Sequence, residues 1–230
     1  PGFFLYNESL SIVCVVNETK SMKIATNSGI VLGKLDKDIY SFKGIPYAEP
    51  PVGKNRWLPT KPITPWSEEK DCTEYGPISP QNEAVYDNEA TSEITQSLSN
   101  QSEDCLSLNI WTPEIKGDKR PVMVWIHGGA WWMGSGNEDI LNPDNICRNK
   151  EFVVVSINYR LACFGFLRLT DITEGKIDST GCEALLDQIE ALKWIKKNIQ
   201  FFGGDENNIS VIGQTAGGHS ISTLISMPSA

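Results

Sequence analysis

Residues 209–218 read ISVIGQTAGG and join two different local patterns. The stretch from Ile209 to Ile212 predicts a brief strand, and the apolar residues that continue to about Ile225 predict a helix. Between them, GQTAG at 213–217 has the form G-x-S-x-G with Thr215 in the serine position. Glycines on both sides let a strand turn abruptly into a helix, so the central hydroxyl is exposed beside helix amides. This order predicts an α/β fold and a candidate nucleophile at Thr215.

The same alternation of strand and helix extends upstream. Short apolar or β-branched runs predict strands at Leu106–Trp111, Val122–Ile126 and Phe152–Ile157. The last two are nearly continuous in apolar character, which is typical of strands covered on both faces, so they belong in the middle of a sheet. An amphipathic helix is expected at Glu183–Ile199, because apolar residues recur there near a 3.6-residue spacing and glycines follow where a helix should stop.

The N-terminal third has a different character. Short alternating runs at residues 23–48 predict a small antiparallel hairpin or meander, and residues 50–101 predict a long irregular excursion. The expected architecture is α/β, with a mostly parallel central sheet and a small antiparallel N-terminal sheet.

A second glycine-rich turn follows one of the predicted central strands. Residues 125–131 read WIHGGAW. Free backbone N–H groups in such a turn are suited to stabilise a developing oxyanion. Two pieces of one site are therefore predicted, one at each turn.

Further motifs occur in a fixed order along the chain: FKGIPYA at 42–48, PPVG at 50–53, SEDCL at 102–106, NYR at 158–160, LLDQ at 185–188 and FGGD at 202–205. Together with residues 213–217, they resemble the motifs of type B carboxylesterases and cholinesterases, which are α/β-hydrolases. The resemblance covers residues 23–230 as the N-terminal part of such a domain, and it leaves residues 1–22 as an N-terminal extension.

The resemblance implies a reaction in which a serine hydroxyl attacks a small-molecule carboxylic ester. Position by position, Thr215 takes the place of the nucleophile. Gly129, Ala130 and Ala216 take the places whose backbone N–H groups form the oxyanion hole. The family's acid and catalytic histidine lie in the second half of a longer chain, so a second polypeptide that carries this half is an expected partner.

Threonine at position 215 departs from the family pattern. A β-branched residue is costly where the backbone takes a positive φ, although threonine keeps a hydroxyl and acts as a nucleophile elsewhere. Three interpretations stay open: absent or very slow hydrolysis, real activity with a completing segment, or an engineered change. Neither of the chain's two histidines is the expected base, because His127 precedes the oxyanion glycines and His219 lies one helical turn after Thr215.

The resemblance also bears on ion pairs and thiols. Arg56 with Glu103, and Arg160 with Asp187, resemble the family's structural ion pairs. Relatives with a disulfide in this region usually have its first cysteine at the position of Ser79. A bridge from Cys72 to Cys105 is one alternative, and free thiols are the other and favoured one. Free thiols favour a cytoplasmic location, with secretion as the alternative.

Composition restricts the function classes. The formal net charge of −9 and the lack of a basic cluster exclude a nucleic-acid partner. No apolar run reaches the length of a membrane span, and no cysteine or histidine spacing indicates a metal site. No cofactor is expected.

The residues near the second turn indicate what kind of ester is expected. Trp131 and Trp132 suggest an apolar acyl pocket, with plain core packing as the alternative. A quaternary-ammonium substrate is disfavoured, since no tryptophan lies between Cys72 and Cys105.

Three functional hypotheses follow. The first is an ester hydrolase that is weak or needs its C-terminal half on another chain. The second is a catalytically inactive, cholinesterase-like binding or adhesion module. The third is a truncated product whose exposed sheet edge drives self-association.

Overall fold

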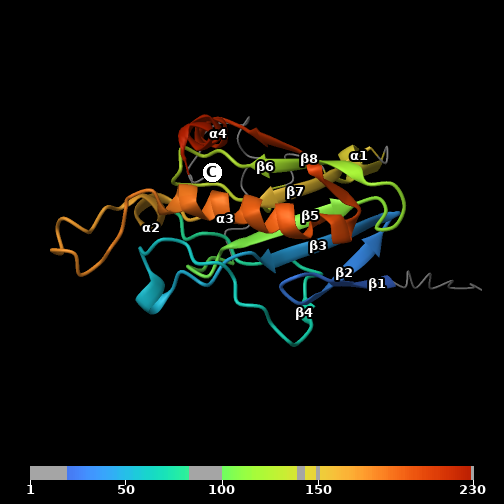
Figure 1. Ribbon diagram of the computed structural model, residues 1–230, viewed down its shortest axis with the longest axis horizontal. Coiled ribbons are helices and arrows are strands. Elements are labelled where there is room, and N and C mark those ends of the chain that lie inside the picture. Colours follow the sequence, from blue (N-terminus) through green and yellow to red (C-terminus); the bar gives the residue numbers. More distant parts are fainter. Residues whose placement is uncertain (1–19, 83–99, 139–142, 149–150, 229–230) are drawn as a thin grey trace, which may run out of the picture.

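The computed structural model describes residues 20–82, 100–138, 143–148 and 151–228. In this part of the chain, eight strands form one mixed sheet in the order β1-β2-β3-β5-β7-β6-β8, and β4 pairs with β2 outside that path. Figure 1 shows α3 lying across one face of the sheet, with α4 beside the end that β6 and β8 form.

The strands are β1 Lys20–Ala25, β2 Ile30–Asp36, β3 Ile39–Pro46, β4 Lys70–Asp71, β5 Ser107–Thr112, β6 Arg120–Ile126, β7 Val153–Ile157 and β8 Gly204–Gly213. The α-helices are α1 Pro143–Arg148, α2 Ala162–Phe166, α3 Glu183–Asn198 and α4 Ala216–Ser226, and 3-10 turns lie at η1 Gly53–Asn55 and η4 Ile199–Phe202. Among the described residues, no helix is both long and apolar enough to cross a bilayer.

Pairing divides the sheet into two regions. Neighbouring strands are antiparallel from β1 through β2, β3 and β5 to β7, whereas β6 runs parallel to both β7 and β8. The expected combination of a parallel central region and antiparallel N-terminal strands is confirmed. The N-terminal strands do not form a separate sheet, because Tyr40 in β3 pairs directly with Thr112 in β5.

The predicted central strands occupy the middle of the sheet. Every residue of β5 and β7 is buried. Along β7, Val153 and Val155 join the main core under α3, while Val154 points to the opposite face and packs with Trp111 and Cys147. Burial on both faces explains the continuous apolar character of this segment.

Helix α3 supplies the largest helical contribution to the core. Its buried face includes Leu185, Ile189, Trp194 and Ile195. The 3-10 turn η4 continues the helix until Gly203, whose φ of 81° ends it. This left-handed conformation suits glycine, as the stop signal in the sequence predicts.

Candidate active site

The turn between β8 and α4 is as sharp as the sequence predicts. Thr215, between the end of β8 and the start of α4, has φ 42° and ψ −109°. A Cβ atom on Gly213 would lie 2.5 Å from the carbonyl carbon of Gly217, and one on Gly217 would lie 2.1 Å from the carbonyl oxygen of Ile126. Only glycine fits at these two positions, so backbone packing forces the bend that presents residue 215.

The Thr215 side chain faces the second turn. Thr215 is exposed, and its Oγ1 accepts a hydrogen bond of 2.5 Å from the backbone N–H of Ala216. A Cβ atom on Gly128 would lie 3.4 Å from this Oγ1 and 2.8 Å from the carbonyl oxygen of Gln214. The hydroxyl and the glycine-rich turn are therefore immediate neighbours.

Sheet register explains why the two turns meet. Ile126 at the end of β6 pairs with Gly213 at the end of β8, in parallel. The carboxyl ends of parallel neighbours lie at the same edge of a sheet, which is where ligands bind in open α/β sheets. Segments that are almost ninety residues apart in the chain thus come together through ordinary strand pairing.

The glycine-rich turn has a strained and specific backbone. Gly129, Ala130 and Trp131 all have positive φ, at 101°, 52° and 62°. The carbonyl of Gly129 accepts hydrogen bonds from the amides of Trp132 and Met133, each 3.1 Å long. Consecutive left-handed residues are rare outside glycine, and such strain concentrates at functional sites.

Two hydrogen bonds hold the turn against neighbouring helices. Trp131 Nε1 donates to Ser220 Oγ in α4 at 3.0 Å, and the Trp131 carbonyl accepts from the amide of Ala162 in α2 at 2.8 Å. Ser220 Oγ also accepts from Gln188 Nε2 in α3 at 3.2 Å. Sequence reasoning did not single out Ser220, because nothing in the sequence distinguishes it from Ser222 and Ser226 in the same helix.

Comparison with known proteins identifies the family of this chain. The model of the carboxylesterase family matches residues 20–230. The chain belongs to the carboxylesterase family. It is 42% identical over 207 residues to para-nitrobenzyl esterase of Bacillus subtilis (strain 168), covering 90% of this chain and 41% of that protein.

Two other relatives show the breadth of the family. The chain is 42% identical to phenmedipham hydrolase of Pseudarthrobacter oxydans, covering 88% of this chain and 39% of that protein. A crystal structure of a carboxylesterase from Geobacillus stearothermophilus superposes with a TM-score of 0.80 at 40% identity, covering 90% of this chain and 40% of that one. The α/β-hydrolase fold is thus confirmed, and the chain spans about two fifths of the length of these relatives.

The first histidine of the chain is built into the core. His127 is buried, stacks on Tyr159 with ring centroids 4.3 Å apart, and donates from Nδ1 to the Gly128 carbonyl at 2.8 Å. Burial lowers the pKa of His127 to about 4, although the hydrogen bond to Gly128 opposes the shift. The neutral imidazole is thus held in place and stabilises the glycine-rich turn through its bond to the Gly128 carbonyl.

The second histidine lies on α4. The backbone N–H of His219 donates to the Thr215 carbonyl at 2.9 Å, and its ring lies 5.7 Å from the Trp131 ring. In the described part of the chain, the hydrogen-bond partner of Thr215 Oγ1 is the Ala216 amide, and neither histidine bonds to it. The catalytic roles of Thr215, Gly129, Ala130 and Ala216 remain predictions.

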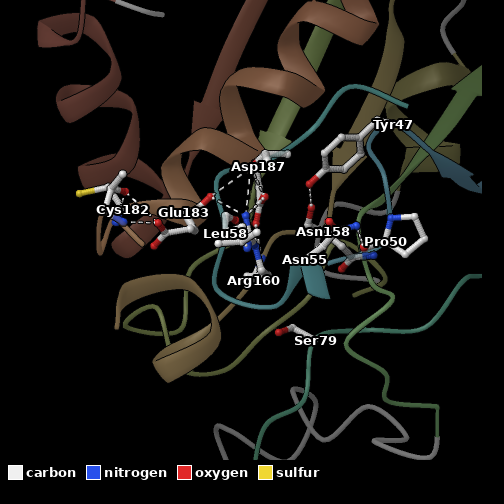
Figure 2. A network of polar contacts seen from close by, with 12 residues as sticks. Tyr47, Pro50, Asn55, Leu58, Ser79, Asn158, Arg160, Cys182, Glu183 and Asp187 are labelled. Carbon is white, nitrogen blue, oxygen red and sulfur yellow. Dashed lines mark hydrogen bonds and ion pairs between the residues drawn. The ribbon is translucent and has the colours of Figure 1, made fainter. Parts of the chain in front are cut away.

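Both expected ion pairs form. Arg160 binds Asp187 through Nε and Nη2, each at 2.8 Å, and the two side chains are almost completely buried. Figure 2 shows the guanidinium of Arg160 between Asp187 and the carbonyl of Leu58. Burial alone would lower the pKa of Arg160, but the attraction of Asp187 raises it overall.

The second pair, Arg56–Glu103, is half-buried and has two hydrogen bonds of 2.5 and 2.6 Å. Cys72 and Cys105 are both buried and are free thiols, so the bridge between them does not form. Burial raises the pKa of each thiol to about 12.

Within the described ranges, no cluster of His, Cys, Asp or Glu is arranged to bind a metal ion.

Proposed function

We propose that this chain carries the nucleophile position and the oxyanion amides of a carboxylic ester hydrolase. The observation that supports this most directly is the strained backbone of Thr215, which holds an exposed hydroxyl beside the Gly128 turn. Strain at a β-branched residue costs free energy, about 1–3 kcal/mol, and persists only where the surrounding structure imposes it.

The proposed reaction is acyl transfer. Thr215 Oγ1 attacks the ester carbonyl carbon while a general base accepts the hydroxyl proton. The carbonyl oxygen becomes an oxyanion that accepts hydrogen bonds from the amides of Gly129, Ala130 and Ala216. The bond from the carbonyl carbon to the alcohol oxygen then breaks, and that oxygen takes the proton from the base. Water hydrolyses the acyl-threonine in the same way, releasing the carboxylic acid and restoring the hydroxyl.

The base is proposed to come from a C-terminal half of the domain, on this chain or on a second polypeptide. Strand β8 ends the sheet order on its side of the described structure. Two large apolar side chains are exposed, Ile212 of β8 at 41% and Ile225 of α4 at 82%. Unpaired strand edges and exposed apolar residues favour the docking of further structure.

Threonine is proposed to be a slow nucleophile here. The amide of Ala216, one of the three proposed oxyanion donors, is already bonded to Thr215 Oγ1. This bond has to be exchanged for one to the substrate oxygen before the transition state can be stabilised. The loss of one oxyanion donor costs about 10²–10³ in kcat in a well-studied protease.

The same hydrogen bond favours a second candidate function. A hydroxyl that is occupied by its own helix amide is what an inactive binding or adhesion module would contain. In that case the domain would bind a partner protein and would not catalyse a reaction.

A reducing compartment is proposed from the thiols. Cys72 and Cys105 are buried free thiols, an arrangement that is usual for proteins of the cytoplasm. Secretion stays the alternative.

The decisive experiment compares turnover of a chromogenic aryl ester by the completed protein with Thr, Ser or Ala at position 215. We expect Thr215→Ser to raise kcat and Thr215→Ala to remove activity above background. If all three proteins show the same background rate, the hydrolase proposal is wrong and the binding module is favoured.

A further inference from the structure

A buried polar network fixes the segment 134–138, which leaves the glycine-rich turn and belongs to no role assigned so far. The backbone N–H of Gly136 donates to Asn158 Oδ1 at 2.8 Å, and its carbonyl accepts from Ser156 Oγ at 2.5 Å. Asn109 Nδ2 donates to the same carbonyl at 3.2 Å. The three side chains are at most 1% exposed, so groups that water does not reach bind Gly136 to β5 and to the end of β7.

Between this network and the turn, Gly134 is held by a glutamine from a distant segment. Gln81 Oε1 accepts from the backbone N–H of Gly134 at 2.8 Å, and Gln81 Nε2 donates to the Gly134 carbonyl at 3.0 Å. The same Nε2 donates to the Ser79 carbonyl at 3.1 Å. One primary amide thus bonds to both backbone groups of a single residue that lies 53 positions away. These two hydrogen bonds to Gly134 are the Gln81 clamp.

The segment that carries Gln81 is itself anchored. The backbone N–H of Gln81 donates to Gln101 Oε1 at 2.7 Å, and Ile78 forms a short parallel bridge with Gln101. The buried Ser79 Oγ accepts from the amide of Leu161, the residue before α2, at 3.1 Å. The clamp therefore connects Gly134 to a fixed part of the domain.

The clamp acts where the glycine-rich turn closes on itself. The residues at 129–131 all have positive φ, and such strain persists only where the surrounding structure imposes it. The sheet holds one end of the turn, because Ile126 ends β6 and pairs with both neighbouring strands. The other end is Gly134, since a Cβ atom there would lie 2.7 Å from the Gly128 carbonyl oxygen. Gln81 therefore binds the residue that closes the turn.

We propose that Gln81 is a positioning residue for the oxyanion hole. By binding both backbone groups of Gly134, it keeps Gly129 and Ala130 in the strained conformation in which their amides can serve one substrate oxygen. The inference rests on the proposed function, because it names a further residue that the proposed reaction needs. Gln81 touches no reacting atom in this scheme, so its loss acts on the turn first and on turnover only through the turn.

Amide hydrogen exchange of the 230-residue chain, followed by peptide mass analysis, tests the clamp without catalysis. The amides of Trp132 and Met133 report on the turn, because both donate to the Gly129 carbonyl. Gln81→Ala should speed their exchange about tenfold, since two hydrogen bonds that close the turn are lost. Peptides from β7 are the internal reference and should change by less than about twofold, because the opening is local.

Gln200→Ala is the matched control, because Gln200 is an exposed glutamine in η4, and it should change exchange at neither place. Unchanged exchange at the turn in Gln81→Ala, or equal acceleration at the turn and in β7, overturns the proposal.

Gln81→Glu tests the pairing of donor and acceptor. A protonated carboxyl has one acceptor oxygen and one O–H donor, as the amide has, whereas an ionised carboxylate has acceptors only. The carbonyls of Gly134 and Ser79 face the donor atom, so the ionised form should open the turn. Relative to the unsubstituted protein at the same pH, exchange at the turn should be several-fold faster at pH 8 than at pH 5. His127 and Glu138 lie beside Gly134 and titrate in both proteins, so this ratio removes their effect, and an equal ratio at both pH values overturns the proposal.

Turnover separates this inference from the proposed function. In the completed protein, Gln81→Ala should lower kcat for an aryl ester about tenfold and change KM by less than about twofold, because the oxyanion forms only in the transition state. An unchanged kcat despite a loosened turn would overturn the positioning role and leave the hydrolase intact. If the unsubstituted protein has no turnover while Gln81→Ala still loosens the turn, the hydrolase alone is refuted.

Discussion

Replacing Ser220 by alanine tests whether one hydroxyl holds the glycine-rich turn to the helices behind it. Ser220 is completely buried, and its Oγ accepts from Trp131 Nε1 and Gln188 Nε2. Ser220→Ala removes both acceptor contacts at once. Gln188 Oε1 already lacks a partner within the described structure, so the variant leaves the whole buried amide unpaired.

The magnitude follows from the two donors that lose their acceptor. An unsatisfied, fully buried amide costs about 1–3 kcal/mol, and the half-buried indole N–H loses a bond with a net value of about 1 kcal/mol. The free energy of unfolding should therefore fall by about 2–4 kcal/mol. This is a large share of the ~5–15 kcal/mol that a typical domain has.

The assay is urea denaturation, followed by tryptophan fluorescence. Ser222→Ala is the matched control, because Ser222 is an exposed serine on the same helix and bonds only to the Gly218 carbonyl in the described structure. We expect the control to change the free energy of unfolding by less than about 0.5 kcal/mol. If Ser220→Ala is no more destabilising than Ser222→Ala, the reasoning about the tether is wrong. In a double-mutant cycle with Trp131→Phe, the two substitutions should be non-additive.

Two further predictions concern charge. Asp187→Ala should destabilise the fold by about 3–5 kcal/mol, because it leaves Arg160 buried and unpaired. Asp171→Ala is the control, because the ion pair of Asp171 with Arg168 is exposed. It should hardly change the stability measured by thermal or urea unfolding. The pKa of His127 is about 4 in the folded chain and 6.5 in the unfolded chain. Between these pH values the unfolded chain binds a proton at His127 and the folded chain does not. Stability should fall by about 3 kcal/mol between pH 6.5 and 4, and the His127→Gln variant should lack that component when unfolding is measured across the same range.

Much of the fold could be predicted because its signals are local. The apolar run that became β7 is buried on both faces, and the glycine pair at 203–204 ends the helical segment, as periodicity and stop signals indicate. The turn at 213–217 could be predicted because its glycine spacing is a local pattern, although the contact that requires Gly217 is with the distant carbonyl of Ile126.

What could not be predicted depends on partners that are distant in the sequence. The antiparallel pairing of β5 with β7 follows from which strands become neighbours, and the continuous apolar character of β7 indicates burial on both faces but not the direction of each neighbour. Ser220 contacts residues 32 and 89 positions away, so its tethering role appears only after the helices have packed. The bond from the Ala216 amide to Thr215 Oγ1 depends on a side-chain rotation that spacing alone does not specify.

The pairing of Ile126 with Gly213 means that main-chain hydrogen bonds of the sheet bring the two turns to the same edge. None of those bonds involves the side chain at position 215. A substitution at position 215 is therefore expected to leave the register of β6 and β8 unchanged, while it changes the local strain at the turn and the hydrogen bond to the Ala216 amide.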